Sequence, residues 1–196
     1  MSRIHPLEPS EAPDRAGEIL DSIIDRHGTP GPMVRTMAHS PALLQGYLDL
    51  SRAMKRAKLP RTLSERVSLA VQEWIGCRLC LAAHTDAGRR GGLTETSIAL
   101  ARQSLSTDPA KTTLLGFAVR VLVEPSAITD QDIADLRHHG WTDRAIADVV
   151  GLVALNQLTG SLNLVAGFEP DTAPNPETTD RATTVFRGSS STRILQ

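Results

Sequence analysis

The residues that could do chemistry are concentrated in one stretch, Glu65–His84, which reads ERVSLAVQEWIGCRLCLAAH. It contains the only two cysteines of the chain, Cys77 and Cys80, spaced as C-x-x-C. His84 follows four residues after the second cysteine, and Glu65 precedes the first by twelve. Two thiols, an imidazole and a carboxylate at this spacing predict cysteine-based redox chemistry with proton transfer.

Helical geometry would bring the thiols and the imidazole together. If a helix begins at Cys77, then at about 100° per residue Cys77, Cys80 and His84 share one face. A thiol in the first helical turn lies at the positive end of the helix dipole, which lowers its pKa and favours the reactive thiolate. This argument by itself favours Cys77 as the more acidic thiol. Glu65, on the preceding helix, would orient His84 if the two helices pack antiparallel after Gly76.

Two cysteines this close can form a disulfide once one of them has been oxidised to a sulfenic acid. We therefore expect a cycle in which a peroxide is reduced to an alcohol, the disulfide forms, and an external dithiol reduces it. The cycle needs no metal, flavin or other cofactor. A zinc cluster would need four ligands, and a second C-x-x-C or histidine pair is missing from the sequence.

The elements that must position these residues are predicted to be α-helices. Apolar residues recur at helical spacing, and no stretch alternates with the period of two that marks a strand. Aromatic residues make up only 3% of the chain, so the core must consist of Leu, Val, Ile and Ala. We expect an all-α bundle of roughly seven or eight helices, near residues 14–27, 41–58, 65–75, 77–90, 94–101, 108–124, 129–139 and 142–166, with Ser64 as a helix cap and a turn at 29–32.

The length of 196 residues suits one domain. We expect an extended lead-in over residues 1–13, a single helical domain over 14–168, and a Pro/Thr/Ser-rich tail over 169–196. The tail is expected to be disordered or to form an arm on a neighbouring subunit. The apolar helix around 145–164 predicts a homo-oligomer (trimer, hexamer or dimer), with Asn156 forming hydrogen bonds at its interface.

Charge and hydropathy exclude several partners. The net charge of −1 offers no electrostatic footprint for nucleic acid or an acidic membrane. No apolar run reaches the roughly eighteen residues needed to cross a bilayer, so we expect no membrane span, and the N-terminus lacks the apolar core of a signal peptide. Two cysteines spaced as C-x-x-C in such a chain predict a reducing compartment, so we expect a cytoplasmic protein.

The spacing E-x11-C-x2-C-x3-H resembles the signature of the alkylhydroperoxidase D / carboxymuconolactone decarboxylase superfamily. Glu65, Cys77, Cys80 and His84 occupy its positions, and the flanking Leu63–Arg66 and Leu81–His84, with the helix from Thr142 to Asn156, are similar too. The resemblance covers about residues 35–168. It implies an AhpD-like helical fold and a cysteine-dependent, homo-oligomeric peroxidase. It also implies that Cys80 attacks the peroxide, Cys77 resolves, and Glu65 and His84 relay protons.

The residues between the cysteines depart from the family pattern. The founding peroxidase has a histidine between its cysteines, whereas this chain has Arg78 and Leu79. A hydrogen-bond donor is lost, while the Arg78 charge would still favour a thiolate. Several functions remain open beside reduction of organic hydroperoxides or hydrogen peroxide. They are dithiol–disulfide exchange, redox sensing by an oligomer, a carboxymuconolactone decarboxylase-like reaction that needs no cysteines, and a purely helical scaffold.

Overall fold

The structure, a computed structural model that describes residues 2–170, contains nine α-helices and two short 3-10 helices in that range. No strand occurs among these residues, so the predicted all-α class is confirmed. The helices are α1 (Arg15–His27), α2 (Pro32–Met37), α3 (Pro41–Met54), α4 (Arg61–Ile75), α5 (Arg78–Arg90), α6 (Glu95–Arg102), α7 (Pro109–Val123), α8 (Asp130–His138) and α9 (Asp143–Ala166), with the 3-10 helices at Pro9–Glu11 and Pro125–Ala127.

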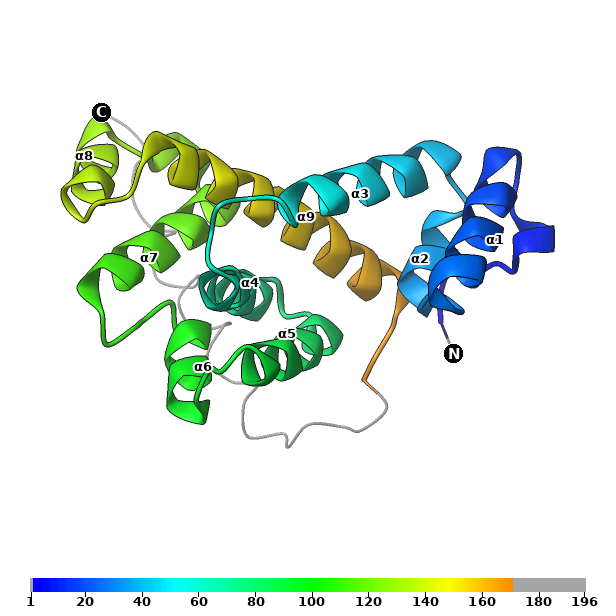
Figure 1. Ribbon diagram of the computed structural model, residues 1–196, viewed down its shortest axis with the longest axis horizontal. Coiled ribbons are helices and arrows are strands. Elements are labelled where there is room, and N and C mark those ends of the chain that lie inside the picture. The colour runs from blue at the N-terminus through cyan, green and yellow to red at the C-terminus, as the bar shows by residue number, and fades with distance from the viewer. Residues whose placement is uncertain (1, 171–196) are drawn as a thin grey trace, which may run out of the picture.

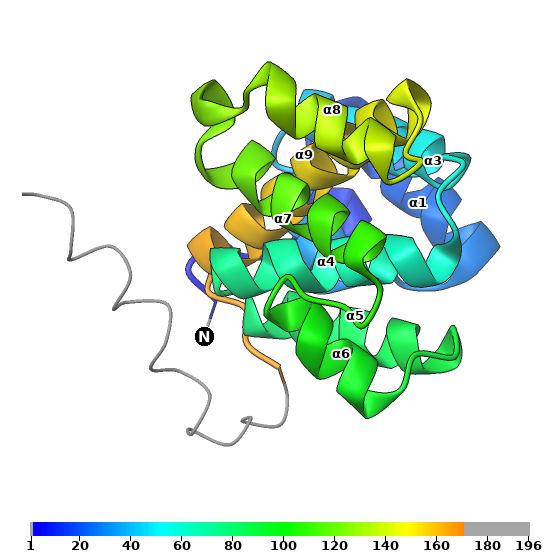
Figure 2. The ribbon, with the colours of Figure 1, turned by 90° about the vertical axis from the view of Figure 1, so that its left-hand side faces the viewer.

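The longest helix, α9, crosses the molecule and the other helices are arranged around it (Figure 1). The first two helices lie near its C-terminal end and α8 lies at its N-terminal end. Helix α4 lies between two layers, with α7 and α9 on one side and α5 and α6 on the other (Figure 2). The central position of α4 allows it to connect the core to the helix that carries the cysteines.

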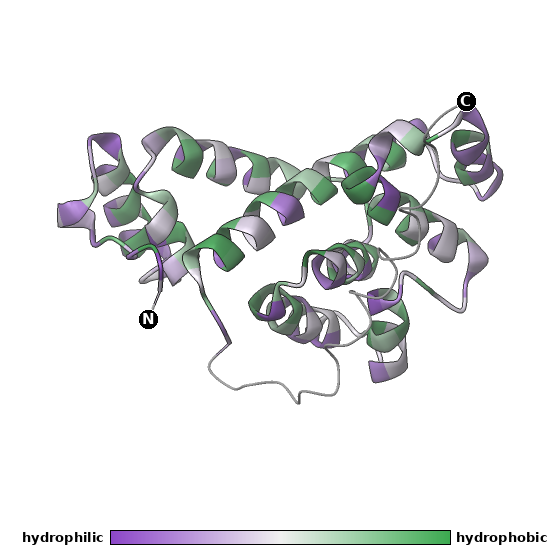
Figure 3. Cartoon of the chain, turned by 180° about the vertical axis from the view of Figure 1, so that it is seen from behind, coloured by the Kyte–Doolittle hydropathy of each residue, from purple (hydrophilic) through white to green (hydrophobic). Residues whose placement is uncertain are grey.

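Helix α9 packs on α4 through a stripe of buried residues. Along the chain, these residues are three and four positions apart in alternation. Such steps place side chains on one face of a helix. Figure 3 shows hydrophobic residues concentrated on the central helices and hydrophilic ones on α8. The stripe is therefore the face that α9 turns towards the core, and it consists of Ile146, Val149, Val153, Asn156, Gly160 and Asn163.

The sequence predicted no apolar run long enough to cross a membrane, and α9 departs from that prediction. Within the described residues it is the one helix long and apolar enough to cross a membrane, with 24 residues and a hydropathy of 1.5 over its most apolar window. Asn156 and Asn163 interrupt the run of apolar residues, but the mean hydropathy of the window stays high enough for a membrane span. Packing of one face on α4 accounts for part of this composition, and 33% of the window is buried.

Two helix boundaries differ from the sequence prediction. Residues 29–32 were expected to form only a turn, but Pro32 occupies the first position of a short helix, α2, which raises the helix number to nine. Proline fits that position because its missing N–H has no partner there in any case. Ser64 was expected to cap the next helix, but α4 begins at Arg61 after Pro60, and the Ser64 hydroxyl donates back to the Pro60 carbonyl.

The N-terminal segment is more than an extended lead-in. It contains the 3-10 helix Pro9–Glu11, and Leu7 is buried in the core beneath α2. The backbone N–H of Leu7 donates to the Arg35 carbonyl, and Arg35 Nε donates to the Leu7 carbonyl. Of the predicted tail, Glu169 and Pro170 are described, while residues 171–196 lie outside the described part of the chain.

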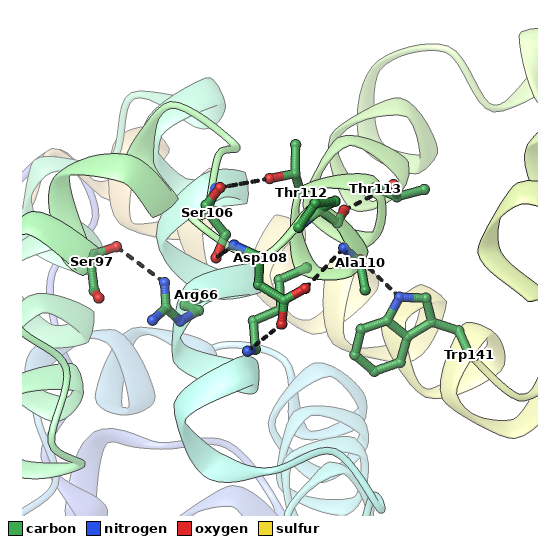
Figure 4. Close-up of polar contacts among 10 residues, drawn as sticks. Arg66, Ser97, Ser106, Asp108, Ala110, Thr112, Thr113 and Trp141 are labelled. Atoms are coloured by element: carbon green, nitrogen blue, oxygen red, sulfur yellow. Dashed lines mark hydrogen bonds and ion pairs between the residues drawn. The ribbon is translucent and has the colours of Figure 1, made fainter. Parts of the chain in front are cut away.

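Polar contacts join α4 to α6 and join the start of α7 to Trp141, as Figure 4 shows. Arg66 Nη1 donates to the Ser97 carbonyl of α6 over 3.4 Å. Asp108 caps α7, and Trp141 Nε1 donates to the Ala110 carbonyl in the first turn of α7 over 2.9 Å. The bond from Arg66 ties the turn of α4 that contains Glu65 to α6.

Candidate active site

The C-x-x-C pair opens α5 as predicted. Gly76 adopts the left-handed conformation (φ +77°) and ends α4, and its N–H donates to the Gln72 carbonyl over 2.9 Å. Glycine adopts this conformation at little cost because it has no Cβ. Cys77 then caps α5, with its Sγ accepting a hydrogen bond from the Cys80 N–H over 3.2 Å. The first cysteine is therefore the N-cap and the second lies in the first turn.

The two cysteines are bonded to each other as a disulfide, with their Cα atoms 5.3 Å apart. Both are buried, Cys77 with 1% and Cys80 with 6% of its surface exposed. Cys80 Sγ also accepts a hydrogen bond from Asn163 Nδ2 of α9 over 3.2 Å. The pair is thus in the state that a redox cycle would produce after oxidation.

The structure brings Glu65 and His84 together. Helices α4 and α5 form a hairpin around Gly76, so the first part of α4 lies against the middle of α5. Glu65 Oε2 lies 2.9 Å from His84 Nδ1. A carboxylate only accepts hydrogen bonds, so the proton lies on Nδ1 and Nε2 stays free to exchange another proton. The Glu65 side chain is 16% exposed and that of His84 is 30% exposed, which leaves His84 accessible to a substrate.

All four predicted site residues therefore lie on two adjacent helices. His84 follows Cys80 by one helical turn, and residues at this spacing have Cβ atoms about 5–6 Å apart. The geometry contains a disulfide pair, an imidazole and a carboxylate that orients it. This arrangement suits a nucleophile, a proton-transfer group and an orienting group in one relay.

A buried polar network lies between α4 and α9, next to the cysteine helix. Gln72 Nε2 donates to Asn156 Oδ1 over 3.0 Å, and Asn156 Nδ2 donates to Ser68 Oγ over 3.1 Å. The expectation that Asn156 forms hydrogen bonds at an oligomer interface is wrong, because its amide is buried inside the chain. The sequence shows that the residue is polar in an apolar helix but not which helix faces it.

Sequence reasoning missed two residues next to the cysteines. Glu169 Oε2 accepts hydrogen bonds from Arg78 Nη2 over 2.7 Å and from Nε over 3.2 Å. The positive charge that was expected to favour a thiolate is therefore paired with a carboxylate. Asn163 was also missed, although its position seven residues after Asn156 on the same face of an apolar helix is a detectable signal.

Two cavities lie away from these residues. One, of about 500 Å³, lies between α1 and α3, where burial raises the pKa of Tyr47. The other, of about 450 Å³, lies along the outer face of α9 and is lined by residues such as Leu158, Leu162 and Val165. Within residues 2–170, His, Cys, Asp and Glu side chains form no group of three or more that could hold a metal ion.

Comparison with known families supports the resemblance seen in the sequence. Residues 41–124 match the model of the carboxymuconolactone decarboxylase family, and this span includes all four site residues. No functionally curated protein matches the chain. The family match and the likeness to AhpD-like structures together confirm the predicted resemblance.

Solved structures share the fold over most of the chain. A peroxidase-related protein with an AhpD core from Ralstonia eutropha has a TM-score of 0.72 at 22% identity, covering 90% of this chain and 94% of that one. A peroxidase-related protein from a Silicibacter species has a TM-score of 0.69 at 18% identity, with coverages of 90% and 94%. A debrominase has a TM-score of 0.69 at 17% identity, with coverages of 87% and 92%. At these identities the likeness shows the fold.

Proposed function

We propose that this AhpD-like protein, with its carboxymuconolactone decarboxylase family region, is a cysteine-dependent peroxidase that reduces organic hydroperoxides or hydrogen peroxide. One observation carries the proposal. The Glu65 carboxylate is hydrogen-bonded to His84 Nδ1, one helical turn beyond a cysteine pair that can close a disulfide. A structural disulfide would not need an oriented imidazole beside it.

The first step would oxidise one sulfur. The Cys80 thiolate attacks the terminal oxygen of the hydroperoxide, so an S–O bond forms and the O–O bond breaks. Cys80 becomes a sulfenic acid, and the alkoxide leaves with a proton from the His84 imidazolium. The Glu65 carboxylate accepts the Nδ1 proton of His84 and so orients the ring, with its Nε2 towards the reacting oxygen.

The second step would form the disulfide. The Cys77 thiol attacks the sulfenic sulfur of Cys80, so the S–S bond forms, the S–O bond breaks and water leaves. His84 moves the proton from the Cys77 thiol to the departing hydroxide. An external dithiol then supplies two electrons and two protons, and thiol–disulfide exchange returns both cysteines to the reduced form.

Burial of the sulfurs favours a small oxidant. With 1% and 6% exposure, Cys77 and Cys80 present little surface to a bulky disulfide substrate, whereas a hydroperoxide needs access only to one sulfur. The proposal therefore ranks peroxide reduction above general dithiol–disulfide exchange. It includes a cytoplasmic location and a homo-oligomer, and it requires a reductant slender enough to reach the pair.

A second candidate comes from the debrominase that shares this fold. A cysteine-to-alanine variant of that debrominase was crystallised with 2,3,4-tribromopyrrole. The same dithiol could reduce an organobromide, in which case C–Br is replaced by C–H, two thiols become a disulfide and HBr leaves. Both candidates use the same cysteine pair, so the substrate separates them.

The test is mass spectrometry of alkylated protein after one equivalent of tert-butyl hydroperoxide. We expect rapid loss of two free thiols as an intramolecular disulfide in the wild type and none in Cys80→Ser. His84→Gln should slow the step by about 10²–10⁴-fold, the usual contribution of a general acid–base group. His139→Gln, on the exposed end of α8, is the matched control and should react at the wild-type rate.

Either of two results would overturn the peroxidase proposal. Thiols that stay free for many minutes would show that peroxide is not the oxidant. Equal rates for His84→Gln and the wild type would show that the pair reacts without a proton relay, as in simple thiol exchange. Loss of bromide from tribromopyrrole by the reduced protein, with slow peroxide reaction, would instead support the debrominase candidate.

A further inference from the structure

A buried asparagine of α9 contacts the redox pair in a way that the proposed cycle does not use. Asn163 Nδ2 donates to Cys80 Sγ over 3.2 Å, and Asn163 is only 5% exposed. A disulfide sulfur has no proton to give, so only the N–H end of the amide can form this bond. The hydrogen bond to Cys77 Sγ comes instead from the backbone N–H of Cys80.

The end of α9 holds Asn163 in place. Gly167, at φ +74°, ends the helix, and the N–H of Phe168 donates to the Asn163 carbonyl over 3.0 Å while that of Gly167 donates to the Leu164 carbonyl over 3.2 Å. This pair of bonds is a Schellman motif, which satisfies carbonyls at a helix end. Arg3 donates to the Leu164 and Ala166 carbonyls as well. The backbone of the turn that carries Asn163 is therefore fixed, and the bond to Cys80 Sγ sets the direction of the side-chain amide.

The other end of the amide shows that packing alone does not explain Asn163. Its Oδ1 is buried and has no hydrogen-bond partner within residues 2–170. An unpaired buried carbonyl disfavours folding. By contrast, Asn156, one heptad earlier on the same face, uses both ends of its amide with Gln72 and Ser68. The one hydrogen bond of the Asn163 side chain is to Cys80 Sγ, so we infer that its role is to bind that sulfur.

We propose that Asn163 is a catalytic hydrogen-bond donor that stabilises the Cys80 thiolate and so selects Cys80, rather than Cys77, as the attacking thiol. The inference rests on the proposed function, because it assigns the first step of that cycle to one sulfur. A hydrogen bond to an ionised acceptor is stronger than one to a neutral acceptor, so it favours the thiolate over the thiol. Cys77 Sγ accepts a backbone N–H bond of the same length, so the Asn163 bond offsets that advantage, and His84, one helical turn from Cys80 but two from Cys77, then favours Cys80.

The experiment measures the pKa of Cys80 alone. In a Cys77→Ser background, the rate of iodoacetamide alkylation is followed against pH, with and without Asn163→Ala. Loss of the donor should raise the pKa of Cys80 by about 1–2 pH units, from the strength of a hydrogen bond to a charged group. Asn156→Ala is the matched control, since it removes a buried amide from the same face without touching the sulfur, and should leave that pKa unchanged. In a Cys80→Ser background, Asn163→Ala should leave the pKa of Cys77 unchanged.

An unchanged pKa of Cys80 in Asn163→Ala would overturn the inference. So would an equal rise for Cys77, because that would indicate a general loosening of the site. If Asn163→Ala does not fold, the Asn163 side-chain amide proton is followed by NMR in the Cys77→Ser protein. Its chemical shift should titrate together with Cys80, and a shift that stays constant through that titration overturns the inference.

These outcomes are separable from the fate of the proposed function, because no peroxide is used. A raised pKa of Cys80 together with no reaction towards tert-butyl hydroperoxide would support Asn163 as the thiolate donor and reject the peroxidase. Fast peroxide reduction together with an unchanged pKa would support the peroxidase and reject the role of Asn163.

Discussion

Helix α9 packs tightly against α4 at Gly160, and replacing this glycine with alanine tests whether the tight packing positions the site. A Cβ at Gly160 would lie 2.6 Å from Gln72 Oε1 and 3.0 Å from Ile75 Cγ2. Gln72 is wholly buried, and its Nε2 donates to Asn156, so it cannot move without loss of those hydrogen bonds. The clash must therefore move α9 away from α4.

The magnitude follows from three opposing effects. Alanine is favoured over glycine inside a helix by about 1 kcal/mol. Overpacking a core costs about 1–3 kcal/mol, and weakening the Gln72 hydrogen bonds costs about 0.5–1.5 kcal/mol for each bond lost. With one of those hydrogen bonds lost, Gly160→Ala should lower the free energy of unfolding by about 0.5–3.5 kcal/mol, the sum of the two penalties less the helical gain.

Two glycine-to-alanine variants serve as controls. A Cβ at Gly116, in α7, meets nothing within 4 Å, so Gly116→Ala should raise stability by up to about 1 kcal/mol. A Cβ at Gly151, in α9, would meet Met54 Sδ at 2.7 Å, but the end of that flexible side chain can move aside. The free energy of unfolding of Gly151→Ala should therefore lie between those of Gly160→Ala and Gly116→Ala.

Urea unfolding, followed by tryptophan fluorescence, measures all three variants. The dependence of the unfolding free energy on urea concentration should have the same slope in all variants. A change in the urea midpoint then measures a change in stability. A Gly160→Ala protein as stable as Gly116→Ala would refute the view that glycine is needed for the contact of α9 with Gln72. Because Asn163 lies one turn beyond Gly160, we also expect slower alkylation of the reduced Cys80 in Gly160→Ala.

Three further predictions concern the site and its frame. Glu65→Gln, which keeps a hydrogen-bond acceptor but removes the charge, should slow peroxide reduction by about 10–100-fold in stopped-flow assays, and an unchanged rate would contradict the relay. Hydrogen bonds from Thr129, and then from Arg120, hold the pKa of Asp132 below its usual 3.8. The Asp132 carboxylate therefore stabilises the fold above its usual pKa, and this contribution is lost as the pH falls through the lower pKa that Asp132 has in the folded protein. Thr129→Ala should therefore lose less thermal stability on acidification than the wild type does. Reduction of the disulfide, which closes a loop of only a few residues, should lower the free energy of unfolding by no more than about 2 kcal/mol in urea titrations; a larger loss would indicate a structural disulfide.

The sequence by itself determined the fold class and most helix limits, because these depend on local signals. Gly76 permits the left-handed turn that ends α4, and the next residue, Cys77, caps α5. The spacing of Cys77, Cys80 and His84 then fixes their common face through helical periodicity alone. The short helix α2 was missed because its proline is equally typical of a turn and of a first helical position.

Only the tertiary structure decided which faces meet. The bond between Glu65 and His84 depends on the hairpin of α4 and α5, and the bond between Asn163 and Cys80 joins residues 83 positions apart. Asn156 was placed wrongly for the same reason, since periodicity identifies a buried face but not the helix that covers it. Local spacing is set by the geometry of one helix, whereas partners across helices are set by the packing of the whole chain, in which apolar burial is non-directional.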